Sequence, residues 1–185
     1  MTKAHVLVAY TDDEPGVLNR VASLCRRRGY NIHSLTVGPT EQAGVSRMTI
    51  VVDTDEVGVV HVQSNLEKLL NVQKVENLSA TPSIVRDLIL LRVAAEPDRR
   101  AEVLQLATAL KAVVVDIAAD SLILECTGSA GKLDALLDIM RPYGILEMGR
   151  TGVVAMGRGR GFFGEQSSHT GAESLVPNYI SQSAR

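Results

Sequence analysis

The pattern of apolar and polar positions repeats one order of elements twice along the chain. Residues 4–80 and residues 85–156 each predict strand, helix, strand, strand, helix, strand. The order βαββαβ gives an antiparallel four-stranded sheet with both helices on one face, which is the ferredoxin-like arrangement. We therefore expect an α+β protein made of two such units, and each sheet then has a bare second face.

In the first unit, proline and glycine residues mark the ends of the predicted elements. We expect strands at 5–10, 31–37, 45–52 and 72–78, and a second helix at 56–70. Pro15 fits the first turn of the first helix, because its missing N–H costs nothing there. Apolar residues then recur with helical period, and Gly29 ends the helix as a C-terminal cap. The apolar positions of this stripe are Val17, Leu18, Val21, Leu24 and Cys25.

The second unit follows the same scheme. We expect strands at 88–93, 113–117, 122–126 and 145–154. Pro97 is expected to open one helix, and Ser129 is a plausible N-cap for the other. The units are predicted at residues 3–80 and 85–156, joined by a linker at 81–84 that contains Thr81-Pro82-Ser83. Residues 157–185, glycine-rich and then rich in Ser and Gln, are expected to form a flexible tail.

Composition narrows the class of protein. Of 185 residues, 45% are hydrophobic, yet only two are Phe, four are Tyr and none is Trp, so the cores must be aliphatic. A net charge of −2 provides no overall attraction to nucleic acid or to a membrane. We find neither a signal segment nor an apolar run near the ~20 residues of a membrane span, which predicts a cytoplasmic protein. Cys25 and Cys126 are expected to be buried, reduced thiols.

Several motifs of catalytic or binding type have weak support. Residues 159–164 match G-x-G-x-x-G, but no strand-helix-strand unit fits around them. The surrounding run, with Arg158 and Arg160, also resembles an Arg-Gly tract that could contact RNA. Asp12, Asp13 and Glu14 could form a metal cluster, although carboxylates before a helix more often serve its N-terminal dipole. We find no metal-ligand spacing among the histidines and no activated nucleophile, so no metal or catalytic residue is predicted.

The turn around Gly16 is the strongest candidate for a binding site. A helix start exposes backbone N–H groups and a partial positive charge, which suit a carboxylate ligand. Gly16 leaves room for close approach to the backbone, and Asn31 offers both a donor and an acceptor. These properties match an amino-acid zwitterion. The alternative is a Pro-Gly turn that only starts a helix.

Three runs of residues resemble the regulatory (small) subunit family of acetolactate synthase, also called acetohydroxyacid synthase. Residues 13–21 read Asp-Glu-Pro-Gly-Val-Leu-Asn-Arg-Val, residues 27–37 contain Arg-Gly-Tyr-Asn-Ile, and residues 46–50 read Ser-Arg-Met-Thr-Ile. Residues 131–136 and 150–154 look like the C-terminal domain of that family. The resemblance covers roughly residues 3–160.

The resemblance implies a fold, a ligand and partners. The first unit would be an ACT domain, a sensor that pairs edge to edge with a second copy and binds a branched-chain amino acid, usually valine, at that interface. Ligand contacts would come from Asp13, Gly16, Val17 and Leu18 of one chain and from Asn31 and Ile32 of the other. The second unit would help engage the catalytic (large) subunit. That subunit, not this chain, would hold thiamine diphosphate, Mg²⁺ and FAD.

Two readings compete with a regulatory subunit that activates the synthase and confers feedback inhibition. One is a free-standing ACT sensor that acts on another partner, and the other is an enzyme on a ferredoxin-like scaffold. The chain departs from the family at Asp12-Asp13, where Glu-Asn is common, so the identity of the effector is open. In the second unit, residues 96–100 lack a counterpart of Gly16, which argues against a second ligand site.

Overall fold

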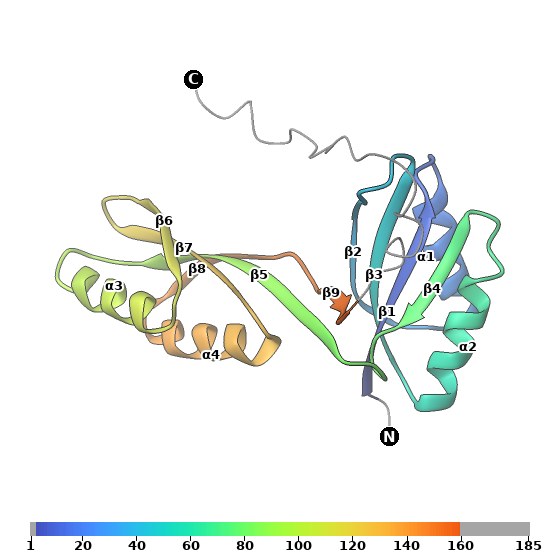
Figure 1. Ribbon diagram of the computed structural model, residues 1–185. Helices are drawn as coiled ribbons and strands as arrows, with labels where there is room; N and C mark the ends of the chain where they lie inside the picture. The colour runs from blue at the N-terminus through green and yellow to red at the C-terminus, as the bar shows by residue number, and fades with distance from the viewer. Residues whose placement is uncertain (1–2, 160–185) are drawn as a thin grey trace.

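The computed structural model describes residues 3–159 of the chain. In the first unit, the strands form one antiparallel sheet of order β2-β3-β1-β4, and both helices cover one of its faces (Figure 1). The elements of this unit are β1 (Lys3–Asp12), α1 (Val17–Arg28), β2 (Ile32–Pro39), β3 (Val45–Thr54), α2 (Glu56–Leu66) and β4 (Val72–Asn77).

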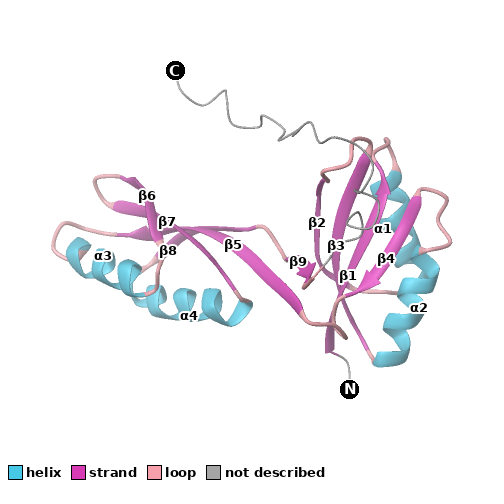
Figure 2. Cartoon of the chain, in the orientation of Figure 1, coloured by secondary structure: helices cyan, strands magenta, loops and turns pink. Residues whose placement is uncertain are grey.

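The second unit repeats this arrangement with strand order β6-β7-β5-β8 and with its two helices on one face (Figure 2). A short additional strand, β9, lies outside this order and pairs antiparallel with the beginning of β5. The elements are β5 (Ser83–Ala94), α3 (Arg100–Ala109), β6 (Val113–Ile117), β7 (Ser121–Gly128), α4 (Ala130–Met140), the 3₁₀ turn η1 (Arg141–Tyr143), β8 (Ile145–Arg150) and β9 (Val154–Gly157). The prediction of two ferredoxin-like α+β units is confirmed.

Each unit has an aliphatic core between its sheet and its helices. The strands alternate, so Leu7 and Ala9 of β1 face the helices while Val8 and Tyr10 face the other way. In the second unit Ile89, Leu91 and Val93 of β5 are fully buried against the two helices. Both cysteines are buried as predicted, and burial raises the pKa of the Cys25 thiol.

A third apolar cluster covers part of the outer face of the first sheet. Val8, Tyr10 and Val45 come from that sheet, whereas Ala155 comes from β9 and is fully buried. The Arg47 guanidinium donates a hydrogen bond to the Ala155 carbonyl oxygen and lies over the Tyr10 ring. The end of the second unit therefore packs on the sheet face that the helices of the first unit leave bare.

Several predicted boundaries are wrong. The strand expected at 145–154 is two strands, β8 and β9, because Gly152 adopts a positive φ of 85° that interrupts extended pairing. Pro15 and Pro97 precede their helices, which begin at Val17 and Arg100. The second helix ends at Leu66 instead of residue 70.

The remaining differences concern segment ends. Ser129 occupies the N-cap position of α4, but its side chain makes no capping hydrogen bond. Strand β5 already begins at Ser83, within the expected linker, and β9 includes Gly157, the first residue of the expected tail. The rest of that tail, from residue 160 on, lies outside the described residues. Among residues 3–159, no helix is long and apolar enough to cross a membrane.

We predict that Leu91→Ala lowers the free energy of unfolding of the second unit by about 2–5 kcal/mol, because it opens a cavity in a packed core. The matched control is Leu90→Ala, one residue away on the opposite, half-exposed face of β5, which should cost about 1 kcal/mol or less. Urea unfolding followed by circular dichroism measures both. Equal losses would contradict the assignment of the two faces.

Candidate functional site

The start of α1 has the properties expected of a carboxylate-binding site. Gly16 is its N-cap residue, with a left-handed φ of 90°, and no described side chain caps this end of the helix. The first turn contains no acidic residue, and a Cβ built on Gly16 would have open space around it. The Val17 N–H donates to the Glu14 carbonyl oxygen at 3.4 Å, and the positive end of the helix dipole is accessible to an anion.

The three carboxylates before α1 bind side chains from β3, from β4 and from the loop that leads into β4, and none of them caps the helix. Asp12 accepts hydrogen bonds from Asn71 and Gln73, at 3.2 and 2.8 Å, and Glu14 accepts one from Asn71 at 3.1 Å. Asp13 accepts one from the Ser46 hydroxyl at 2.9 Å. That these carboxylates serve the helix dipole stays a prediction, since they make no capping hydrogen bond.

Asn71 connects this turn to the helix. It is only 7% exposed, and its side-chain Oδ1 accepts a hydrogen bond from the Arg20 guanidinium of α1, while its side-chain Nδ2 donates to Asp12 and Glu14. The backbone N–H of Asp12 also donates to the Asn71 carbonyl. Asn71 thus fixes the turn that presents Gly16. Sequence reasoning missed this residue because nothing local marks a polar residue between α2 and β4 as part of the site.

Val17 and Leu18 differ in what they can offer to a ligand. The Val17 side chain is 4% exposed and packs in the core, so only its backbone faces the turn. The Leu18 side chain is 46% exposed and is accessible to a ligand or to a second chain. The structure therefore brings Asp13, Gly16, Val17 and Leu18 together within one short segment.

Asn31 and Ile32 lie at the opposite end of the same unit. Ile32 is aligned with Val52 and, through it, with His5, whereas the turn follows Asp12 at the far end of β1. Seven residues of β-strand separate these levels, which corresponds to about 23 Å. Asn31 and Ile32 therefore cannot meet a ligand at Gly16 of their own chain.

The position of β2 indicates how the Gly16 turn of one chain can meet Asn31 and Ile32 of another. In this sheet β2 is an edge strand, paired only with β3 among the described strands. An antiparallel pairing of β2 with β2 of a second copy places the start of one strand beside the end of the other. The end of β2 lies next to the turn, since Asp13 donates its backbone N–H to the Gly44 carbonyl in the β2–β3 loop. Such a pairing would bring Asn31 of one copy toward Gly16 of the other.

A cavity of about 560 Å³ lies between the two units. On its floor Asp87, 5% exposed, accepts hydrogen bonds from the Arg150 guanidinium at 2.5 Å and from the Thr151 hydroxyl at 3.1 Å. Arg150 also pairs with the more exposed Asp134 at 3.1 Å. Burial alone would lower the pKa of Arg150, but its bonds and attraction to the two carboxylates raise it. The cluster holds the end of β8 to β5.

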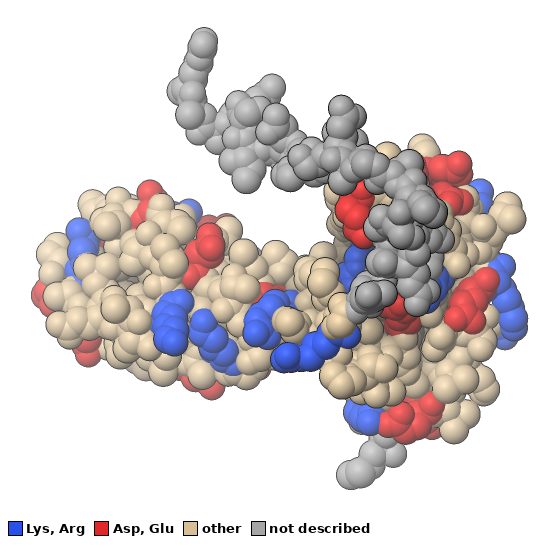
Figure 3. All heavy atoms as spheres, in the orientation of Figure 1, with Lys and Arg blue, Asp and Glu red and all other residues tan. Residues whose placement is uncertain are grey.

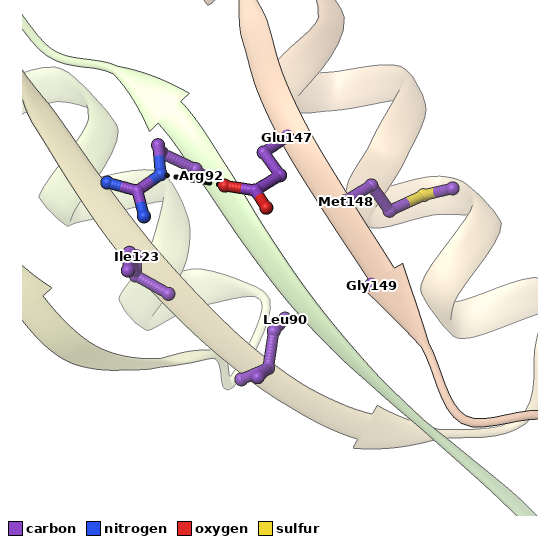
Figure 4. Close-up of a pocket in the computed structure, with 6 residues that line it drawn as sticks. All are labelled: Leu90, Arg92, Ile123, Glu147, Met148 and Gly149. Carbon is purple, nitrogen blue, oxygen red and sulfur yellow. Dashed lines mark hydrogen bonds and ion pairs between the residues drawn. The ribbon is translucent and has the colours of Figure 1, made fainter.

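A smaller hollow of about 220 Å³ lies on the outer face of the second sheet. Figure 4 shows Arg92 and Glu147 directed toward one another, 3.2 Å apart, with Leu90 and Ile123 beside them. Leu90 and Met148 are 44% and 50% exposed, so this face is apolar and accessible. Figure 3 shows both signs of charge on both lobes of the visible face, with a row of basic side chains along the second unit that reaches the junction between the units.

The fold and the site define a class of protein: a two-unit regulatory chain whose first unit is an ACT domain. A sequence model described as the AHAS small subunit-like ACT domain matches residues 7–74, and one described as the small subunit of acetolactate synthase matches residues 86–159. The chain belongs to the acetolactate synthase small subunit family.

Individual relatives support this assignment. The probable acetolactate synthase small subunit of Archaeoglobus fulgidus is 48% identical over 84% of this chain and 97% of the relative. The acetolactate synthase small subunit of Mycolicibacterium smegmatis is 43% identical over 85% of this chain and 93% of the relative. The crystal structure of the acetolactate synthase small subunit from Thermotoga maritima superposes with a TM-score of 0.79 at 31% identity, covering 85% of this chain and 99% of that one.

We predict that Asp87→Ala destabilises the chain by up to about 3 kcal/mol, because it leaves the partly buried Arg150 and Thr151 without their buried acceptor. The control, Asp134→Ala, removes the exposed partner of the same arginine and should cost less than about 1 kcal/mol. Thermal and urea unfolding report both losses. A larger loss for Asp134→Ala would overturn this description of the cluster.

Proposed function

We propose that this chain activates the catalytic subunit of acetolactate synthase and confers feedback inhibition by valine or a related branched-chain amino acid. As a member of the small subunit family, it is a non-catalytic subunit in branched-chain amino acid biosynthesis. The observation that carries the proposal is the uncapped N-terminus of α1 at Gly16, in the unit that matches the family's ACT domain. The protein is proposed to act in the cytoplasm.

The effector is proposed to lie between two copies of the chain. Its carboxylate would accept hydrogen bonds from backbone N–H groups at Gly16, Val17 and Leu18, where the helix dipole favours an anion. Its ammonium group would lie near Asp13. Ser46 uses one oxygen of that carboxylate, and a carboxylate has room for further donors.

The second copy would complete the site. Asn31 would supply polar contacts, and Ile32 an apolar one for the branched side chain. This arrangement requires the homodimer through β2, because the two halves of the site lie about 23 Å apart in one chain. The ACT dimer and the effector site are therefore one proposal.

The catalytic subunit is the proposed partner of the second unit. Thiamine diphosphate, Mg²⁺ and FAD are expected in that subunit, and no cofactor is assigned to this chain. Inhibition then requires a coupling free energy, typically ~1–3 kcal/mol: valine must favour a dimer state that activates the partner less. Because linkage is reciprocal, binding of the catalytic subunit should weaken valine binding by the same factor.

The proposal is tested by acetolactate formation from pyruvate by the catalytic subunit, with and without this chain, titrated with valine. Activation followed by loss with valine supports both parts of the proposal. Activation without a valine response would retain the partner and require a titration with leucine and isoleucine. Absence of any effect would favour a free-standing sensor.

We predict that Gly16→Asp abolishes inhibition while the chain still folds and activates. A new carboxylate at the start of α1 would repel the carboxylate of the ligand, and a side chain there meets open space. The matched control is Gly159→Asp, since Gly159 also has a positive φ, 93°, and open space. Retained valine sensitivity in Gly16→Asp would refute the site.

We predict that Asn31→Ala desensitises the complex at least about tenfold, which corresponds to the roughly 1.4 kcal/mol expected for polar contacts to a charged ligand. The half-inhibitory valine concentration is the measurement, with activation in the absence of valine as the control. An unchanged half-inhibitory concentration would remove Asn31 from the site.

A further inference from the structure

The segment between β8 and β9, residues 151–153, contacts both units, and we call it the crossover segment. On the side of the second unit, Thr151 donates its backbone N–H to the Leu88 carbonyl, and its hydroxyl accepts from the Leu88 N–H and donates to Asp87. Three hydrogen bonds of 3.1–3.2 Å thus fix this residue to β5.

The same segment is held by the first unit. The Thr36 hydroxyl donates to the Thr151 carbonyl at 3.4 Å, and the Val153 N–H donates to the Ser34 hydroxyl at 3.3 Å. Gly152 lies between these bonds, and a Cβ built there would be 3.2–3.3 Å from Ser34 and Thr36. Glycine at this position therefore permits close approach of the crossover segment to β2.

Strand β2 is also the strand that begins at the proposed effector site. Ile32 and Ser34 are two residues apart, and the pairing of β2 with β3 shifts register between them. An edge strand with an irregular register has fewer backbone restraints than a central one. A small displacement of Asn31 and Ile32 would therefore also move Ser34 and Thr36, which follow on the same strand.

Besides the packing of Ala155 against Val8, Tyr10 and Val45 in the middle of the first sheet, two connections between the units lie at opposite edges of that sheet. The covalent connection leaves from β4, with Leu78 fixed to Val6 and Ser83 fixed to Leu78. The crossover segment contacts β2, at the other edge of the order β2-β3-β1-β4. A shift of β2 relative to β4 would therefore displace the crossover segment relative to the covalent connection.

We propose that Ser34 and Thr36 couple the effector site to the second unit through the crossover segment. This inference rests on the proposed function, because it needs an effector at β2 and a second unit that engages the catalytic subunit. It assigns to these two side chains a role in transmission and no role in binding the effector. Differential contacts of this kind are what allow a ligand to shift a conformational equilibrium.

The test uses the complete complex and valine, with two independent variants. Ser34→Ala combined with Thr36→Val removes both side-chain hydrogen bonds without backbone strain, and Gly152→Ala pushes the crossover segment from β2. Gly159→Ala is the control, because Gly159 has a similar positive φ but no neighbour within 4 Å. Circular dichroism checks the fold of each variant.

The first measurement is the coupling between valine binding and binding of the catalytic subunit. In the unaltered complex, the ratio of valine affinities without and with the catalytic subunit should lie in the typical range of about 5–150-fold. In both variants, we expect this ratio to approach one and maximal inhibition to fall, with valine affinity of the free chain unchanged within about twofold. A ratio equal to that of the unaltered complex would overturn the inference, and a loss of valine binding by the free chain would instead place Ser34 and Thr36 in the binding site.

The second readout needs only the free chain. Valine should change hydrogen exchange of residues 151–157 in the unaltered chain and in Gly159→Ala, but not in the Ser34→Ala, Thr36→Val double variant. An equal change in the double variant would also overturn the inference. If the unaltered chain binds no branched-chain amino acid, the proposed function itself fails, and the inference fails with it.

Discussion

Two helices can cover only one face of a four-stranded sheet. The arrangement of this molecule depends on how the apolar residues on the other face of the first sheet are buried. Part of that face is buried by Ala155 of β9, with Val153 and Val85 packed against the same cluster. Because β9 pairs with the first residues of β5, the same strand that builds the second sheet also carries the cover of the first. The junction between the units is therefore a packed interface with its own apolar cluster, its own hydrogen bonds and an adjoining cavity.

The local pattern predicted the helices and strands because apolar and polar positions recur regularly in each unit and because Pro and Gly mark the element ends. It failed where long-range contacts decide the backbone. The interruption at 151–153 reflects the fit of Gly152 against Ser34, which is more than a hundred residues away in the sequence. For the same reason, the local pattern predicts Pro15 inside α1, although α1 begins at Val17. Asp13 and Glu14 beside Pro15 bind Ser46 and Asn71, and a local pattern does not reveal these contacts.

The candidate site was predictable to different extents. The chemistry of a glycine before a helix identifies Gly16 without reference to other proteins. The donor and acceptor groups of Asn31 also mark it as a candidate, whereas Ile32 is named only through the family resemblance; both are remote from Gly16 within one chain. The structure adds an edge strand whose antiparallel pairing would bring the two halves together, and it adds Asn71 as the residue that holds the turn.

The separation of Gly16 from Asn31 has a genetic consequence. In a two-fold dimer with sites of the proposed kind, each site would take its turn from one chain and its strand from the other. A chain altered at Gly16 and a chain altered at Asn31 would each be defective as a homodimer. A mixed dimer would place both lesions in one site and leave the other intact, so two insensitive alleles would complement each other and restore one of the two sites in each mixed dimer.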